Sequence, residues 1–201
     1  MDSVIYVLFG TTTSMTEEQI RELVDGLERR KHKFVWVLRD ADKVDILKED
    51  GSPKGHDVPE GYKVRVKGLG LVLKDWAPLL EILGHPTTGG FISHCRWNSC
   101  LESLSMRVPI ITWPIYSDQP KNSMLVTKVL RIGVVVKDWA HRDELITSNV
   151  VESAIRRLSA SNEGEGIRKR ERKLGDAGRK SAAKGGTSCI ELDSFVSHIT
   201  R

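Results

Sequence analysis

The stretch GGFISHCRWNSCLESLSMRVPIITW, residues 89–113, decides the fold. Residues 89–94 form an apolar run that predicts a strand, and residues 98–106 predict a helix with an apolar stripe. Residues 108–113 are again apolar and β-branched, so they predict a second strand. A strand, a helix and a strand in this order fold as a right-handed βαβ unit, which makes the two strands parallel.

The same alternation continues on both sides of this unit. Residues 16–31 carry apolar side chains at helical spacing, at Ile20, Leu23, Val24 and Leu27. Strands are also expected at 3–9, 33–39, 69–74 and 132–136, a polar loop at 40–61, and helices at 78–84, 119–130, 143–159, 164–182 and 187–199. We therefore predict an α/β fold, with a doubly wound, Rossmann-like sheet of mostly parallel strands.

The composition is that of an ordinary soluble globular protein. Of the 201 residues, 39% are hydrophobic and 29% are charged, and the N-terminus lacks the features of a signal peptide. No run reaches the roughly 18 apolar residues of a membrane span. The three cysteines, Cys95, Cys100 and Cys189, lack C-x-x-C spacing, which argues against a disulfide framework or a zinc site. We expect a cytoplasmic protein with no membrane partner.

The net charge is +4, and much of the basic character lies in residues 167–184. A nucleic-acid-binding patch would also offer aromatic side chains for stacking, and this segment has none. Glu171 and Asp176 dilute its charge. We expect a solvated helix face and no nucleic-acid partner.

Polar and aromatic side chains follow several of the predicted strands. Ligands of open α/β sheets bind beyond the carboxyl ends of the strands. The residues expected along this one rim are Thr11, Trp76, His94, Asp118 and Gln119.

The chemistry of this rim suits a nucleoside diphosphate joined to a sugar. The N-terminus of helix 98–106, next to His94, suits phosphate oxygens. Trp76 offers a flat face for a base, and Glu102 can accept hydrogen bonds from a ribose diol. The dinucleotide fingerprint G-x-G-x-x-G is missing, because Leu73 stands where its third glycine would be.

Each of these residues also has a purely structural interpretation. Ser99 and Glu102 form the S-x-x-E pattern of a helix capping box. Trp76 could belong to the core, His94 could be a hydrogen-bonded histidine at a strand end, and Asp118 could cap the following helix. These interpretations explain the residues one at a time, but not their convergence on one rim.

Residues 76–119, WAPLLEILGHPTTGGFISHCRWNSCLESLSMRVPIITWPIYSDQ, resemble the donor-binding box of plant UDP-sugar-dependent glycosyltransferases. The motifs W-A-P, H-P, G-G-F, H-C-x-W-N-S, E-S, V-P, W-P and D-Q occur in the family's order. SDQPKN and KDWAHRDEL are most similar to the zeatin O-glucosyltransferase branch. The resemblance identifies residues 1–201 as the UDP-sugar donor-binding domain, the C-terminal half of a two-domain GT-B enzyme, and implies that the N-terminal acceptor domain is absent.

The resemblance also implies the chemistry. The whole enzyme would be a hexosyltransferase that transfers glucose from UDP-glucose, with inversion and without a metal or other cofactor, to a hydroxyl of a small-molecule acceptor such as a zeatin-type cytokinin. The family's catalytic base lies in its N-terminal domain, so no catalytic residue is expected here, and this chain alone would be inactive. The implied donor-binding residues are Trp76 and Ala77 for uracil, Glu102 for ribose, Thr11, His94, Asn98 and Ser99 for the diphosphate, and Trp97, Asp118 and Gln119 for glucose.

Some positions depart from the family's pattern. Leu79 stands at a usual glutamine, and Leu8 replaces a common serine. Arg96 replaces a glycine beside the phosphate site, where it would strain the turn or fill the pocket, or else pair with the diphosphate; we expect impairment. Arg107 stands at a usual turn glycine, at some cost in stability. The alternative function is therefore a non-catalytic nucleotide-sugar-binding remnant or an interaction domain.

Overall fold

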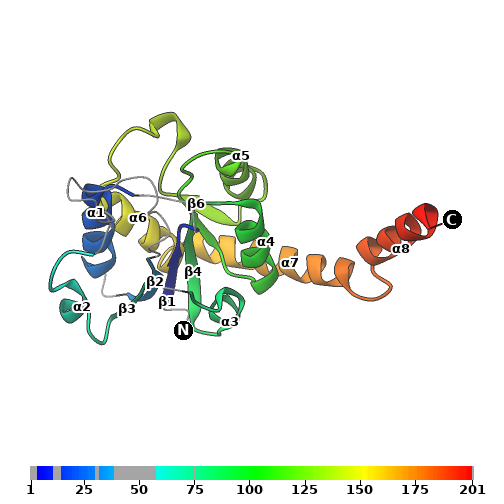
Figure 1. The fold of residues 1–201 in the computed structure, drawn as a ribbon, viewed down its shortest axis with the longest axis horizontal. Coiled ribbons are helices and arrows are strands. Elements are labelled where there is room, and N and C mark those ends of the chain that lie inside the picture. Colours follow the sequence, from blue (N-terminus) through cyan, green and yellow to red (C-terminus); the bar gives the residue numbers. More distant parts are fainter. Residues whose placement is uncertain (1–3, 11–14, 30–31, 39–57, 75, 201) are drawn as a thin grey trace, which may run out of the picture.

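The computed structural model describes residues 4–10, 15–29, 32–38, 58–74 and 76–200 (Figure 1). A six-stranded parallel sheet with the order β3-β2-β1-β4-β5-β6 forms its centre, which confirms the predicted fold class. The strands are β1 (Val4–Leu8), β2 (Lys33–Val37), β3 (Gly70–Leu73), β4 (Thr88–Ser93), β5 (Ile110–Thr112) and β6 (Gly133–Val135).

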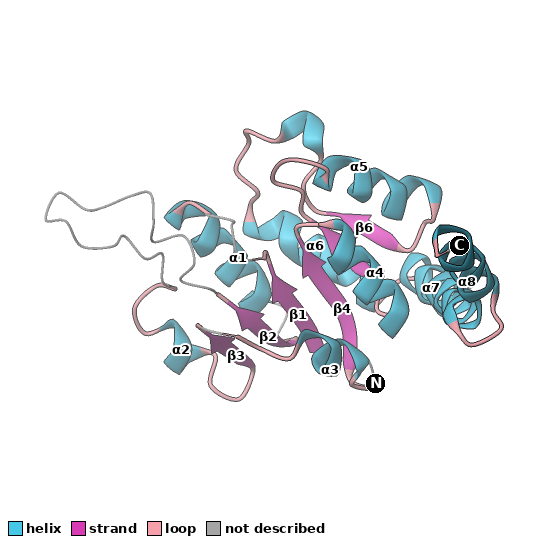
Figure 2. Ribbon diagram, turned by 45° about the vertical axis from the view of Figure 1, so that its right-hand side comes forward, coloured by secondary structure: helices cyan, strands magenta, loops and turns pink. Residues whose placement is uncertain are grey.

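Helices cover both faces of this sheet (Figure 2). They are α1 (Glu17–Arg29), α2 (Tyr62–Arg65), α3 (Leu79–Gly84), α4 (Trp97–Met106), α5 (Gln119–Met124), α6 (Ser148–Ser159), α7 (Asn162–Ala182) and α8 (Thr187–Ile199). A π-helical turn, Leu125–Val129, extends α5, and a 3₁₀ turn lies at Trp139–His141. α1 and α6 pack together on one face, whereas α3 and α4 lie on the other.

The sequence of β1 explains why both faces need helices. Ile5 and Val7 lie in the hydrophobic core on the α1 side, while Tyr6 and Leu8 lie in the core on the α4 side. Successive side chains of a strand point to opposite faces, so a strand that is apolar throughout must be covered on both.

One predicted helix begins later than expected. The pattern predicts a start near residue 143, but α6 begins at Ser148. The N–H of Ile146 donates to Gln19 Oε1 (3.0 Å), and its carbonyl accepts from Gln19 Nε2 (2.7 Å). Because this side chain of α1 already pairs both backbone groups, residue 146 stays outside the helix.

One further difference concerns the segment before β3. The short helix α2 is not predicted by the sequence pattern. Most of the predicted polar loop, residues 40–57, lies outside the described residues.

The last two helices lead away from the sheet. α7 packs against α4 and α6, and α8 contacts α7 and projects beyond the rest of the domain (Figure 1). No helix within the described ranges is long and apolar enough to cross a membrane.

Candidate functional site

The strand order places the candidate site where β1 and β4 lie side by side. From β1 the chain crosses to β2 and β3 on one side, and β4 leads to β5 and β6 on the other. At such a switch point the two crossover connections diverge and leave a crevice at the carboxyl ends of the strands. Gly10 follows β1 and His94 follows β4 at this edge.

The imidazole of His94 is the most deeply buried of the predicted donor-site groups that can carry a charge. Only 2% of the residue is exposed, and Nδ1 has no hydrogen-bond partner in the part of the chain that the structure describes. Burial lowers the pKa of His94 to about 4, with a further contribution from the positive charge of Arg96. The ring is therefore neutral at pH 7 and carries one N–H; in the tautomer that has this proton on Nδ1, that nitrogen can donate to a phosphate oxygen.

Gly10 makes room for this imidazole. Its φ is +87°, and a Cβ at this position would lie 2.6 Å from His94 Nε2. Only glycine combines this backbone conformation with so close an approach. The contact connects the ends of β1 and β4.

A left-handed turn connects His94 to α4. Cys95 has a φ of 65°; its N–H donates to Ser93 Oγ (3.2 Å), and its carbonyl accepts from Asn122 Nδ2 (2.9 Å). α4 then begins at Trp97, and no side chain caps its N-terminus. Without a side-chain cap, its first N–H groups can bind an anion.

The capping-box interpretation of Ser99 and Glu102 is therefore wrong. The helix begins one residue earlier than predicted, with Arg96 at the N-cap position, so Ser99 is the third residue of the helix. Ser99 is 7% exposed, and Glu102 is half-buried, which raises the pKa of its carboxyl.

Arg96 does not strain the turn. Its φ is −61°, an ordinary value for an L-residue, so one reason for expecting impairment is removed. Its guanidinium donates to the Tyr116 hydroxyl (3.0 Å) and lies 5.7 Å from the centre of that ring. Arg107 does adopt a left-handed conformation, with a φ of 60°, and its side chain pairs with Asp176.

The two leucines that depart from the family pattern serve packing. Leu8 is buried in the core on the α4 side, and Leu79 packs against the same core.

The loop between β5 and α5 supplies Asp118 and Gln119. Gln119 is fully buried, and its Oε1 accepts from the N–H groups of Ile115 (2.8 Å) and Tyr116 (3.1 Å). Asp118 occupies the N-cap position of α5, but it makes no side-chain capping bond, so that structural interpretation is wrong. Its Oδ2 instead accepts from Asn122 Nδ2 (2.7 Å), the amide that also holds Cys95.

The predicted aromatic residues are exposed at the surface. Trp76 is 72% exposed, so it is not a core residue, and Trp97 is 47% exposed. Ala77 is buried and Asn98 is exposed. Trp76 and Ala77 precede α3, which packs against α4. Thr11 lies outside the described residues.

The structure thus joins His94, the turn before α4 and Asp118 into one hydrogen-bonded and electrostatic unit. Sequence reasoning missed three members of this unit: Gly10, Tyr116 and Asn122. Asn122 had a signal, because it lies four residues after Asp118 on a predicted helix. Within the described ranges, no cluster of histidine, cysteine or acidic side chains could hold a metal ion.

Comparisons with known proteins point to one family. A family model described as "UDP-glucoronosyl and UDP-glucosyl transferase" matches residues 2–160. The chain is 56% identical over 200 residues to a zeatin O-xylosyltransferase of Phaseolus vulgaris, with 99% of this chain and 44% of the relative covered. It is 53% identical to a zeatin O-glucosyltransferase of Phaseolus lunatus, with 99% and 43% covered.

Solved structures agree with these relatives. The apo form of UGT2 from Phytolacca americana matches 100% of this chain with a TM-score of 0.87 and 31% identity, over 44% of its own length. A transferase from Siraitia grosvenorii in complex with UDP matches with a TM-score of 0.85 and 36% identity, over 100% of this chain and 43% of its own. The chain therefore spans less than half the length of these relatives.

Proposed function

Because this chain belongs to the family of UDP-glucuronosyl and UDP-glucosyl transferases, we propose that it is the donor-binding domain of an enzyme that transfers glucose from UDP-glucose to a hydroxyl of a small acceptor. Its fold is that of the C-terminal domain of a GT-B glycosyltransferase, since solved relatives match it over its whole length.

The arrangement at the start of α4 carries this proposal. An uncapped helix N-terminus lies at the switch point of the sheet, directly after a buried histidine whose Nδ1 has no partner among the described residues. A diphosphate would accept hydrogen bonds from these donors and gain from the helix dipole. In the transferase, the same donors would stabilise the charge that develops on the leaving UDP.

The full set of donor-site assignments includes exposed, half-buried and buried residues, together with Thr11, which lies outside the described residues. We assign the uracil to Trp76 and Ala77, the ribose to Glu102, the diphosphate to Thr11, His94, Asn98 and Ser99, and the sugar to Trp97, Asp118 and Gln119. Trp76 suits the base because an exposed indole gains by stacking. Asp118 suits the sugar because an exposed carboxylate accepts from hydroxyl groups. Gln119 is fully buried, so its amide reaches the sugar only if the loop shifts.

The acceptor we propose is a zeatin-type cytokinin, after the names of the relatives at 56% and 53% identity. Those relatives are more than twice as long as this chain. We assign the acceptor pocket and the catalytic base to the half that it does not match. This domain would therefore hold the donor and the leaving group, and other residues would remove the proton from the acceptor. The three cysteines, all free, suit a reducing compartment such as the cytosol.

Calorimetric titration of the chain with UDP tests the proposal. We expect micromolar binding that weakens about tenfold or more in Trp76→Ala, because base stacking contributes about 1–3 kcal/mol. Glu102→Ala should weaken binding as well, while Trp139→Ala, which removes another exposed tryptophan, should leave it unchanged. A folded chain that binds no UDP, or that binds it equally well as Trp76→Ala, would contradict the proposed donor site.

The sugar is tested by competition. We expect UDP-glucose to bind more tightly than UDP-xylose. The reverse order would reassign the donor to the pentose named in the Phaseolus vulgaris relative.

A further inference from the structure

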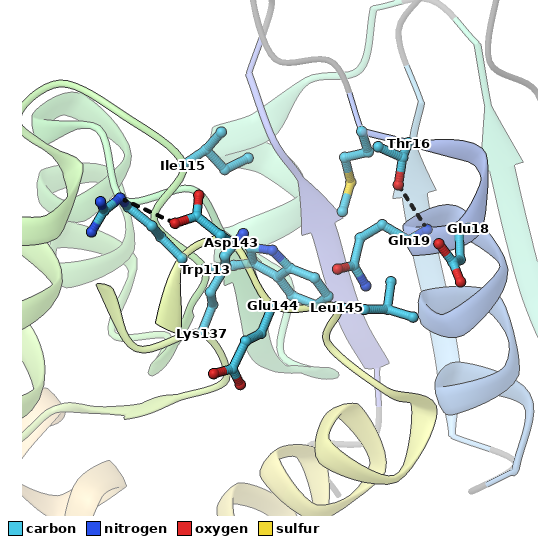
Figure 3. A pocket seen from close by; sticks show the side chains of 11 residues that line it. Thr16, Glu18, Gln19, Trp113, Ile115, Lys137, Asp143, Glu144 and Leu145 are labelled. Atoms are coloured by element: carbon cyan, nitrogen blue, oxygen red, sulfur yellow. Dashed lines mark hydrogen bonds and ion pairs between the residues drawn. The ribbon is translucent and has the colours of Figure 1, made fainter. Parts of the chain in front are cut away.

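A cavity of about 300 Å³ lies between the start of α1 and the segments that follow β5 and β6 (Figure 3). The start of α1, the segments after β5 and β6, and residues 142–145 form its walls. None of the nine described residues assigned to the donor lines this cavity. An occupant would therefore be a second ligand, distinct from UDP-glucose.

The floor of the cavity is apolar and fixed in place. Met15 and Trp113 are buried, and Ile115 packs against the same core. The Trp113 ring meets Phe9 edge-on, at 81° and 5.5 Å, which holds the indole in one orientation. Gln19 ties its wall to the loop before α6 through the two hydrogen bonds with Ile146. Ligand pockets are commonly preformed and apolar in this way.

Lys137 is a charged residue that lines the cavity beside this floor. The residue is half-buried and lines the cavity, and its ammonium makes no hydrogen bond or ion pair with any described residue. Its backbone is fixed, since its N–H donates to the Thr112 carbonyl (3.3 Å). Burial lowers the pKa of Lys137, an effect that Asp143 opposes. A partly desolvated ammonium gains from an anion that enters beside it.

The three acidic groups that line the cavity, Glu18, Asp143 and Glu144, do not meet this need, because all three are exposed to solvent. The side chain of Asp143 is 89% exposed and lies 3.8 Å from Arg142 Nε. The side chain of Glu144 is 69% exposed and pairs with His141 at 2.8 Å. The carboxylates of Asp143 and Glu144 are therefore solvated, and they interact with Arg142 and His141 of their own loop.

We propose that this cavity binds a small organic carboxylate, with its planar apolar body against Trp113 and its carboxylate paired with Lys137. A volume of about 300 Å³ corresponds to about ten water molecules at about 30 Å³ each, which is enough room for an aromatic acid. The apolar floor selects against phosphates and free sugars, which would lose hydrogen bonds to water there.

The test is a titration of the chain with trans-cinnamate in the presence of saturating UDP. We expect saturable binding, and about tenfold weaker binding of cinnamamide, which has the same shape without the charge. Lys137→Met should weaken the binding of cinnamate about tenfold, and Lys137→Arg should retain it. Lys128→Met, which removes an exposed lysine elsewhere, should have no effect.

A second variant guards against a folding defect in Lys137→Met. Leu145 is 38% exposed at the mouth, so Leu145→Glu should fold normally and repel the carboxylate. Equal affinity for cinnamate and cinnamamide, unchanged binding in Lys137→Met, displacement of cinnamate by UDP, or no binding of cinnamate would each overturn the proposal. UDP titration of the same variants reports the donor site separately, so a failure of the donor site and a failure of this cavity are distinguishable.

Discussion

His94 and Glu171 are buried to the same degree but have different surroundings. His94 is 2% exposed and Glu171 is 1% exposed, and each has polar atoms without a partner among the described residues. His94 directly precedes α4 at the edge of the sheet, whereas Glu171 belongs to α7, which packs along the side of α4. Both are neutral at pH 7, because burial lowers the pKa of His94 to about 4 and raises that of Glu171 to about 8.

The surroundings decide what an unpartnered buried group indicates. Beside His94 lie Arg96 and an uncapped helix N-terminus, so an anion that enters there finds donors and positive charge. Burial is the main cause of the raised pKa of Glu171, and the neighbouring thiol of Cys100, which adds to the shift, offers no positive charge. The first arrangement indicates a ligand site, and the second is a cost to stability that protonation removes.

The largest expected effect is a gain in stability from Glu171→Gln at high pH. The folded-state pKa of about 8 exceeds the usual 4.5, so the free energy of unfolding falls as the pH rises from 4.5 to about 8. Gln cannot ionise. The variant should match the unsubstituted chain at pH 5 and exceed it by up to about 4 kcal/mol at pH 9. Urea denaturation at the two pH values measures the difference.

A matched control for this prediction lies in the same helix. Glu165 of α7 is exposed, so Glu165→Gln should give the same small difference at both pH values. If Glu171→Gln behaves like Glu165→Gln, Glu171 is ionised in the folded state and the comparison with His94 fails.

The effect of His94 on stability should have the opposite pH dependence to that of Glu171, and it should be smaller. The folded-state pKa of His94, about 4, lies below the usual 6.5. The contribution of this residue to the free energy of unfolding is therefore fully present above pH 6.5 and is lost as the pH drops towards 4. The loss is at most about 3 kcal/mol, and His94→Gln should abolish it. Urea denaturation at pH 7 and pH 4.5 measures it.

The control here is His198→Gln, which removes an exposed histidine of α8 and should not change the acid dependence. A Glu171→Gln chain that keeps His94 and has the same stability at pH 7 and pH 4.5 would show that the imidazole is accessible to protons.

Local patterns predicted most of the fold, and contacts between distant segments account for the errors. β1 and α1 follow from apolar spacing alone, because each pattern lies within one element. The start of α6 does not, since the bonds that hold Ile146 come from Gln19, 127 residues away in sequence. Glu171 was assigned to a solvated helix face, which is wrong. It lies four residues after the buried Ile167, and this helical spacing was the signal for burial.

Part of the site could likewise be read from the sequence. The positions of His94 and Asp118 after parallel strands follow from topology. The conformation of the turn does not, because the departure from the family pattern is at Arg96 while the left-handed residue is Cys95. A pattern of residue types shows where a turn occurs, but not which residue of the turn adopts the left-handed conformation.

Gly10→Ala probes the contact that fixes His94. A Cβ at Gly10 would lie 2.6 Å from His94 Nε2, whereas a Cβ at Gly68, with a similar φ of +83°, would meet nothing within 4 Å. Both variants carry the strain of a positive φ, so the difference between them isolates the contact. We expect Gly10→Ala to cost about 2 kcal/mol more than Gly68→Ala in urea denaturation. Equal costs would mean that the imidazole moves aside freely.

Arg96→Gly gives the smallest effect and decides between two interpretations of this residue. The guanidinium stacks on Tyr116, and its charge already acts on His94, so it should attract the diphosphate. Removing it should weaken the binding of UDP about fivefold, near 1 kcal/mol, and reduce its salt dependence. Arg142→Gly is the matched control, because Arg142 also stacks on an aromatic ring, that of Trp139 at 5.4 Å, away from α4. Tighter binding in Arg96→Gly alone would mean instead that the arginine fills the phosphate pocket, and the impairment expected from the sequence would stand.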